Sequence, residues 1–285
     1  MKINTLITDK HEYLEKLNII ANYPKKLYKI GEIPEKNTTT VAIVGSRKPT
    51  PYGREVTEML ATELSQHNIV IVSGLALGID GIAHRSTLRA GGTTLAVLAH
   101  GLDSIYPTSH KALAEQIVQN KGALLSEYAP GVPALPHQFL ARNRIVSGLA
   151  DAVVVVEAAA RSGTLSTAAH ALDQGREVFA VPGNITNPLS AGCNALIKQG
   201  ALPVTSTQDI LEIIRPTYTP TQTQFALGDT QEEKTILQLL AEGQRDGDIL
   251  LENSLLNPDI FSQTLTMLEI KGLIQPLGAN QWTLR

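Results

Sequence analysis

The stretch between residues 40 and 53 constrains the fold most, because an apolar β-branched run, a glycine turn and a helix start follow one another there. Residues 41–44 contain no polar side chain, which is typical of a strand buried on both faces of a parallel sheet. Gly45 and Ser46 then allow a tight turn that exposes backbone N–H groups near the next helix N-terminus, where this architecture usually binds anions. Arg47 and Lys48 add two cations. The stretch predicts the first strand–loop–helix unit of a doubly wound sheet, with an anion site at its loop.

This turn does not have the spacing of a nucleotide-binding loop. It carries neither G-x-G-x-x-G nor G-x-x-x-x-G-K-[ST], so we do not expect the anion to be a classical nucleotide cofactor. The histidines show no ligand spacing such as H-E-x-x-H, and Cys193 is the only cysteine, which argues against a zinc site built on cysteines. No G-x-S-x-G elbow indicates a nucleophilic serine. We therefore expect no cofactor, no metal and no catalytic residue.

The strand–helix pattern recurs along the chain. Six further apolar runs of strand length are each separated by a segment of helix length: 69–72, 95–98, 123–125, 151–156, 177–181 and 201–204. Connections this short favour an α/β fold with a mostly parallel, doubly wound sheet and right-handed crossovers. In such a sheet the binding residues lie at the carboxyl ends of the strands.

Composition and pattern divide the chain into four parts. Residues 1–38, broken by prolines and a glycine, are interpreted as a short N-terminal cap on the first strand. Residues 39–215 hold the repeated units, and residues 216–230, rich in Pro, Thr and Gln, are interpreted as a linker. Residues 231–285 contain three helical segments and then two strands, which is the order of a small winged-helix domain.

Charge is distributed unevenly between these parts. The net charge is -3, so nucleic-acid binding has to come from a local basic patch. From residue 229 onward the chain has nine of its 27 acids but four of its 24 bases, which leaves 18 acids and 20 bases before that point. A polyanion is therefore expected to prefer the first part.

The compartment follows from what the sequence contains. No apolar run approaches the roughly 20 residues of a membrane span, and the first ten residues lack the apolar core of a signal peptide. A single cysteine suits a reducing environment. We expect a cytoplasmic protein without a membrane partner.

Five glycine-bearing segments are expected at strand ends, where they would meet along one edge of the sheet. They are Gly45-Ser-Arg47, Ser73-Gly-Leu-Ala-Leu-Gly-Ile-Asp80, Ser162-Gly-Thr164, Val181-Pro-Gly183 and Ala191-Gly-Cys-Asn194. Each one alone is equally well explained by a tight turn. Together with the nearby cations Arg47, Lys48, Arg142 and Arg144, they predict a phosphate-binding crevice.

The segment around Phe139 leaves several roles open. Arg142 and Arg144, two residues apart, point to different faces of a helix, so at most one of them needs to contact a ligand, and the other is available to pair with an acid. Phe139 either stacks on a base or packs in the core. Glu157 and Asp80 lie where a general base would, but no second carboxylate or histidine accompanies them at a recognisable spacing. Capping of a helix, or pairing with an arginine, is therefore favoured for both.

Several of these strings occur together in one known family. Over roughly residues 23–214 the chain resembles the DNA-processing protein A (DprA/Smf) family through Gly45-Ser-Arg47 with Thr50-Pro-Tyr-Gly53, Ser73-Gly-Leu-Ala-Leu-Gly-Ile-Asp80, Arg142-Asn-Arg-Ile145, Ser147-Gly-Leu149, Ser162-Gly-Thr-Leu165, Val178-Phe-Ala-Val-Pro-Gly183 and Gly192-Cys-Asn-Ala-Leu-Ile-Lys-Gln-Gly-Ala201. The resemblance implies an extended Rossmann-like domain that binds single-stranded DNA. It also implies a protein, not an enzyme, that protects incoming strands during natural transformation and loads a RecA-type recombinase onto them.

The family's nucleic-acid pocket maps onto three of the predicted loops. Lys48, a cation of the first of these loops, is added to them. The DNA-binding candidates are Gly45, Ser46, Arg47, Lys48, Phe139, Arg142, Asn143, Arg144, Ser162, Gly163 and Thr164. The chain departs from the family pattern where Phe139 is followed by Leu-Ala, because a proline normally follows that phenylalanine. Residues 1–38 are also too short for the sterile-alpha-motif domain that many members carry at the N-terminus.

Oligomeric state is the last property that the resemblance implies. It predicts a homodimer through the late part of the Rossmann-like domain. That region is rich in apolar residues that serve either an interface or a core: Leu196, Ile197, Leu211, Ile213 and Ile214.

Two other functions are alternatives to DNA binding. The family's domain is similar to nucleotide-binding phosphoribohydrolases, in which Glu157 would act as acid or base on an N-glycosidic bond. That group has a P-G-G-x-G-T-x-x-E signature, whereas residues 157–164 here lack the Pro-Gly-Gly and the glutamate after the threonine. A transcription regulator acting through the winged helix is disfavoured by the acidic balance of that module.

Overall fold

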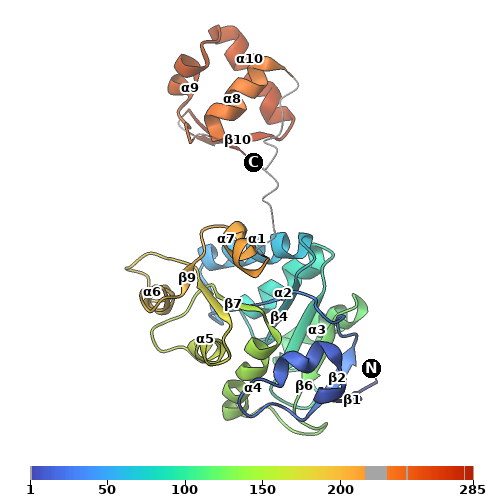
Figure 1. Ribbon diagram of the computed structural model, residues 1–285. Coiled ribbons are helices and arrows are strands. Elements are labelled where there is room, and N and C mark those ends of the chain that lie inside the picture. Colours follow the sequence, from blue (N-terminus) through green and yellow to red (C-terminus); the bar gives the residue numbers. More distant parts are fainter. Residues whose placement is uncertain (1, 216–229, 242, 279, 285) are drawn as a thin grey trace. The chain divides into compact units, whose positions relative to one another are not determined.

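The structure, a computed structural model, describes residues 2–215, 230–241, 243–278 and 280–284. It contains two compact units, Met1–Tyr218 and Thr219–Arg285, and each is described by itself (Figure 1). The sequence predicts a linker over residues 216–230. All of it except residue 230 lies outside the described residues.

The first unit is built on one nine-stranded sheet in the order β1-β2-β6-β5-β4-β3-β7-β8-β9. The strands are β1 (Asn4–Ile7), β2 (Lys26–Gly31), β3 (Thr40–Val44), β4 (Val70–Ser73), β5 (Thr94–Leu98), β6 (Ala123–Ser126), β7 (Ala152–Val155), β8 (Glu177–Ala180) and β9 (Leu202–Pro203). All pairs from β6 across to β9 are parallel. The predicted doubly wound α/β fold is confirmed. The chain steps outward in one direction from β3 to β6 and in the other from β7 to β9, so the topological switch point lies between β3 and β7.

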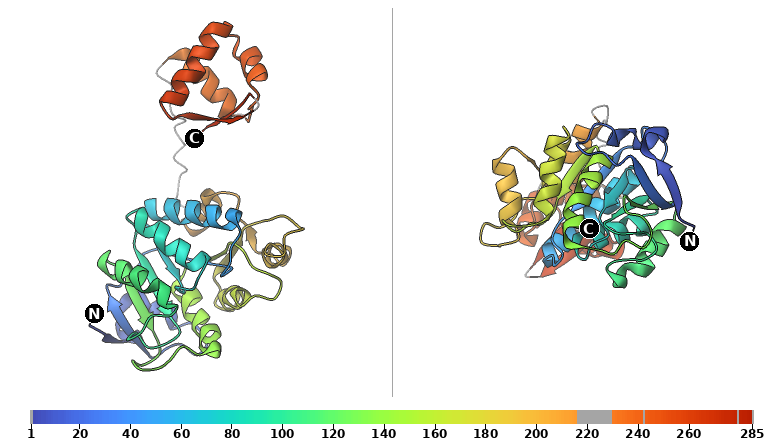
Figure 2. Two further views of the ribbon diagram at one scale, coloured as in Figure 1. Left: turned by 180° about the vertical axis from the view of Figure 1, so that it is seen from behind. Right: turned by 90° about the horizontal axis from the view of Figure 1, so that it is seen from below.

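Helices cover both faces of this sheet (Figures 1 and 2). They are α1 (Pro51–Gln66), α2 (Ile79–Arg89), α3 (Lys111–Gln119), α4 (Pro136–Leu149), α5 (Thr164–Asp173), α6 (Ala191–Lys198) and α7 (Thr207–Ile214), with 3-10 turns η1 (Thr8–Lys10), η2 (Glu12–Leu17) and η3 (Thr108–His110). Successive residues of β3 point to opposite faces. Ala42 therefore joins the core cluster under α4 and α5, while Ile43 joins the one under α1 and α7. Burial on both faces explains why residues 41–44 are uniformly apolar.

Residues 1–38 do more than cap the first strand, which corrects the interpretation from sequence. β2 pairs antiparallel with β6, and β1 pairs antiparallel with β2 at the sheet edge. In β2 only Leu27 and Ile30 are buried. Because β2 buries only these two side chains, it leaves no continuous apolar run, and its pattern did not identify it as part of the sheet.

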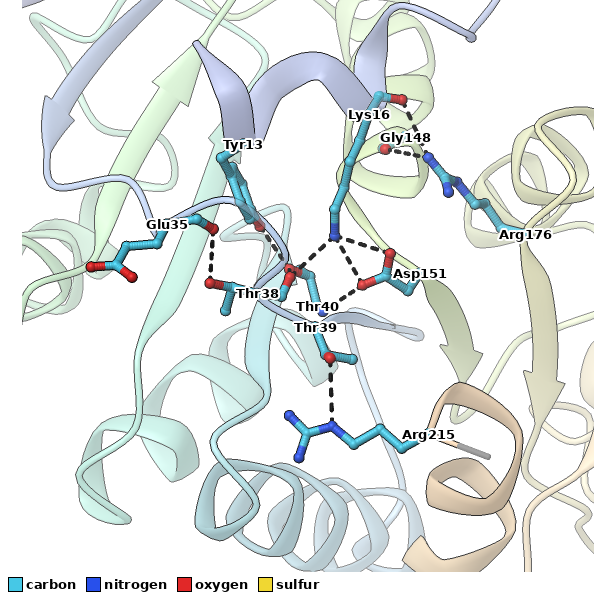
Figure 3. A network of polar contacts seen from close by, with 10 residues as sticks. All are labelled: Tyr13, Lys16, Glu35, Thr38, Thr39, Thr40, Gly148, Asp151, Arg176 and Arg215. Atoms are coloured by element: carbon cyan, nitrogen blue, oxygen red, sulfur yellow. Dashed lines mark hydrogen bonds and ion pairs between the residues drawn. The ribbon is translucent and has the colours of Figure 1, made fainter. Parts of the chain in front are cut away.

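A polar network anchors the N-terminal segment to the amino ends of β3 and β7 (Figure 3). Lys16 Nζ on η2 forms a 2.9 Å ion pair with Asp151, whose carboxylate also accepts a 2.8 Å hydrogen bond from the Thr40 backbone N–H. The Tyr13 hydroxyl shares a 2.7 Å hydrogen bond with the Thr40 side chain. This network stabilises the edge of the sheet opposite the strand ends where binding residues are expected.

The second unit has the element order predicted for a winged helix, and that prediction is confirmed. Its elements are α8 (Gln231–Ala241), α9 (Gly247–Ser254), α10 (Pro258–Ile270), β10 (Ile274–Gly278) and β11 (Gln281–Leu284). Asn257 caps α10 by accepting a 3.0 Å hydrogen bond from Asp259 N–H, with Pro258 in the first turn. Among the described residues, no helix has the length and hydrophobicity needed to cross a lipid bilayer.

Candidate nucleic-acid interface

A cavity of about 340 Å³ opens at the switch point, at the carboxyl ends of β3, β4 and β7. The loop after β3 contributes residues 45–47 and the segment after β7 contributes residues 161–164. Helix α4 contributes residues 139, 140, 142 and 143. Nine of the eleven predicted DNA-binding residues line this cavity: Gly45, Ser46, Arg47, Phe139, Arg142, Asn143, Ser162, Gly163 and Thr164. Lys48 and Arg144 do not.

Backbone hydrogen bonds hold the loop after β3 from both sides. Ser46 N–H donates to the Glu157 carbonyl at 2.8 Å, and the Ser46 carbonyl accepts from Ile79 N–H at 3.1 Å. Gly78, which precedes Ile79, has a φ of +78°, and a Cβ there would collide with the Ser46 carbonyl. The loop is therefore fixed in position before any ligand binds, with the exposed Arg47 side chain at the mouth of the cavity.

Arg47 and two aromatic rings form the rim of the cavity. Arg47 Cζ lies 5.5 Å from the centroid of the Phe139 ring, within range of a cation–π contact. The Tyr106 ring packs edge-on against Phe139 with centroids 5.7 Å apart, and Tyr106 is 51% exposed. Phe139 is thus partly exposed at the rim of the cavity and not enclosed in the core. Sequence reasoning missed Tyr106, because its loop after β5 carries no motif.

Arg142 is positioned to support the cavity floor. Its guanidinium is buried and donates to the Gly74 carbonyl at 2.8 Å and to the Val97 carbonyl. These two hydrogen bonds connect the ends of β4 and β5. Burial lowers the pKa of Arg142 to about 10, an effect that nearby Asp80 opposes, so the side chain stays charged at neutral pH. A Cβ at Gly74 would collide with the guanidinium, which explains the need for glycine there.

Arg144 points away from the cavity, as expected for one of two arginines spaced two apart. Its guanidinium forms an ion pair with Glu127 at 2.7 Å and donates to the Asn22 carbonyl at 3.1 Å. Lys48 is exposed beside the cavity, and its backbone N–H donates to Ser46 Oγ at 3.1 Å.

The N-terminus of α5 faces the same cavity. Thr164 Oγ1 donates to the Gly45 carbonyl at 3.1 Å, which ties the loop after β7 to the loop after β3. Asn143 Nδ2 donates to Ser166 Oγ at 2.9 Å and so connects α4 to α5. The first turn of α5 holds no acidic residue, so its positive dipole end favours an anion in the cavity. Arg161, which sequence reasoning missed, adds a further cation directly before the Ser162-Gly-Thr164 string.

Both candidate carboxylates have structural hydrogen bonds, as favoured from the sequence. Glu157 is buried outside the cavity lining and accepts from the backbone N–H (2.9 Å) and Oγ1 (2.5 Å) of Thr50, the N-cap of α1. Asp80 lines the cavity and accepts from Gly74 N–H at 3.0 Å. Burial raises the pKa of the Asp80 carboxyl, and the Arg142 charge opposes that rise. No cluster of three or more metal-ligating side chains occurs in the ranges that the structure describes.

Comparisons with known proteins agree with this architecture. The family model for DNA recombination-mediator protein A matches residues 4–215, and the DprA winged helix domain model matches residues 219–280. Protein Smf of Escherichia coli is 46% identical over 204 residues, covering 72% of this chain and 54% of that protein. DNA processing protein DprA of Bacillus subtilis is 41% identical over 211 residues, covering 74% and 71%. The chain thus spans only about half the length of the Escherichia coli relative.

Two solved structures share the fold of the first unit. DNA processing protein A from Streptococcus pneumoniae has a TM-score of 0.69 and 42% identity, with 74% of each chain covered. DNA processing protein A from Helicobacter pylori, described for its single-stranded DNA binding mode, has a TM-score of 0.67 and 33% identity, covering 77% of this chain and 98% of that one.

Proposed function

Because the chain belongs to the DNA recombination-mediator protein A family, we propose that its switch-point cavity binds single-stranded DNA. The observation that carries this proposal is the rim, where the Arg47 guanidinium lies over a partly exposed Phe139 ring beside the N-terminus of α5. Such a rim offers a cation and helix-end N–H groups to a phosphate and an aromatic face to a base. The Helicobacter pylori relative supports it, because that protein is described as binding single-stranded DNA.

The proposal extends to the partners that the family resemblance implied. The chain would act without catalysis, protect strands entering the cell during natural transformation and load a RecA-type recombinase onto them. The description of the matched family as a recombination mediator supports that role. Strand-exchange assays with a RecA-type recombinase on DNA coated by single-strand-binding protein test it, and stimulation by the chain is expected.

The position of Glu157 does not support the alternative function of a phosphoribohydrolase, in which this residue would act as acid or base. Glu157 lies outside the cavity lining and its carboxylate accepts two hydrogen bonds from Thr50. A titration with oligo-dT and with duplex DNA at two salt concentrations, beside a nucleotide-hydrolysis assay, separates the two functions. We expect preferential binding of oligo-dT and no hydrolysis. Release of a free base from nucleotides, without oligo-dT binding, would establish the enzyme instead.

Phe139→Leu is expected to lower the affinity for oligo-dT by about fivefold, or about 1 kcal/mol, since stacking of a base on an aromatic ring contributes that much. Fluorescence anisotropy measures the loss. Phe139→Tyr, which keeps the aromatic face, is the matched control and should bind as the native chain does. Equal losses in both variants would argue against stacking.

Deletion of residues 229–285 is expected to leave the affinity for single-stranded DNA within about threefold, or roughly 0.65 kcal/mol. The exposed face of α10 offers Gln263 and Thr266, whereas Thr264 between them in sequence is buried. In the described residues this face presents no lysine or arginine, and phosphate neutralisation needs cations. A loss of about a hundredfold would restore the regulator hypothesis.

A homodimer remains part of the proposal. Of the five apolar residues considered for the interface, Leu196 and Leu211 are buried in the core, Ile197 and Ile214 pack against it, and Ile213 is 46% exposed. Ile213→Asp is therefore expected to convert a dimer into a monomer in light scattering at micromolar concentration. A native chain that is already monomeric there would contradict the dimer.

A further inference from the structure

A second concave surface lies on the outside of α1, α2 and α3. Its volume is about 550 Å³, and its basic residues are Arg54 on α1 with Arg85 and Arg89 on α2. Gln116 and Asn120, at the end of α3, complete one wall. We call this surface the arginine groove.

Positive charge in the arginine groove is only partly balanced. Glu58 is the single acidic residue in its lining, and it forms an ion pair with Arg89 at 3.5 Å in which both side chains are more than half exposed. Pairs of that kind contribute little. The side chains of Arg54 and Arg85 have no hydrogen-bond or ion-pair partner among the residues that the structure describes.

The charges of Arg54 and Arg89 act on the guanidinium of Arg85. The pKa of Arg85 is lowered, first by burial and then by the charges of Arg89 and Arg54. Three like charges that line one concave surface favour binding of a counter-charge. Guanidinium groups match phosphate oxygens through paired N–H donors.

The arginine groove begins near the proposed DNA-binding cavity. Arg54 lies in the first turn of α1, seven residues after Arg47. The neighbouring α2 begins at Ile79, whose N–H donates to the Ser46 carbonyl. Both helices therefore start at the edge of the sheet that carries the cavity, and the arginine groove continues from that edge along one face.

We propose that the arginine groove is a second phosphate-binding surface, which holds the backbone of the same DNA strand after it leaves the cavity. This inference rests on the proposed function. The groove lining has no aromatic residue among the described side chains, so it would bind phosphates without stacking bases and without reading sequence. Its amide side chains from α3 add uncharged donors for phosphate oxygens.

The test compares Arg54→Gln/Arg85→Gln with Lys25→Gln/Lys198→Gln in the full chain. Both double variants remove two exposed positive charges, and Lys25 and Lys198 lie outside both the cavity and the groove. Affinity for oligo-dT of about 6 and about 30 nucleotides is measured at several salt concentrations. Thermal denaturation verifies that each variant is folded.

We expect the arginine variant to bind the long strand about tenfold more weakly, with a salt slope smaller by about 1.4, while the short strand is unaffected. The lysine variant should match the native chain for both strands. If the arginine and lysine variants bind the long strand with the same affinity, the proposal for the arginine groove is wrong. It is also wrong if the arginine variant loses as much affinity for the short strand as for the long strand. Failure of the native chain to bind either strand would instead overturn the proposed function itself.

Discussion

Replacing Arg47 with alanine is expected to weaken single-stranded DNA binding by tenfold or more, about 1.4 kcal/mol. The guanidinium is exposed at the mouth of the cavity, 5.5 Å from the Phe139 ring, on a loop held by hydrogen bonds to Glu157 and Ile79. A fixed loop loses little conformational entropy on binding, so most of the charge-assisted interaction with a phosphate contributes to affinity. Anisotropy titration with labelled oligo-dT measures the change.

Salt dependence separates a phosphate contact from a general charge effect. Arg47→Ala should reduce the salt slope by about 0.7, the value for one single-strand phosphate contact, and the loss should be similar for different base sequences. Lys25→Ala, which removes the same charge from an exposed position outside the cavity lining, is the matched control and should leave affinity and slope unchanged. If the Arg47→Ala protein folds and keeps the native affinity and salt slope, Arg47 does not contact a phosphate and has only a structural role at the rim.

Arg142→Met is expected to lower the free energy of unfolding by about 3 kcal/mol, because it removes a buried charge beside a buried carboxylate. The carbonyls of Gly74 and Val97 would lose a donor, and Asp80 would lose the nearby cation that offsets its burial. For a unit of this size the melting temperature should fall by roughly 6–12 °C. Urea or thermal denaturation measures the loss.

The matched control for Arg142 is an exposed arginine of the same cavity. Arg161→Met should change the free energy of unfolding by less than about 0.5 kcal/mol, since Arg161 is exposed. If Arg142→Met instead has native stability but loses DNA binding, Arg142 contacts the ligand directly and the supporting role assigned to it is wrong.

The sequence allowed most of the sheet to be predicted, because strands buried on both faces leave uninterrupted apolar runs. β3, β4, β7 and β8 all fall on such runs. The edge strand β1 and its antiparallel partner β2 did not stand out, since β1 buries none of its side chains and β2 only two. The loops that form the cavity could be predicted because the carboxyl ends of parallel strands meet at one edge.

The orientation of the arginines on α4 could not be predicted from spacing alone. Spacing showed that Arg142 and Arg144 diverge, but which one points inward depends on how α4 packs on the sheet. Ile145 and Val146 are buried in the core below it, and this packing turns Arg142 toward β4 and β5. The contact of Tyr106 with Phe139 could not be predicted either, because it forms only when the loop after β5 folds against α4.

Photo-crosslinking of oligo-dT to the full chain, with the attached peptides identified by mass spectrometry, tests most directly whether the switch-point cavity binds single-stranded DNA. We expect crosslinks within residues 45–47, 139–143 and 161–164, with the Phe139 peptide among them, and their suppression by excess unlabelled oligo-dT. Crosslinks confined to residues 231–285, or absent from all three cavity segments, would contradict binding in this cavity.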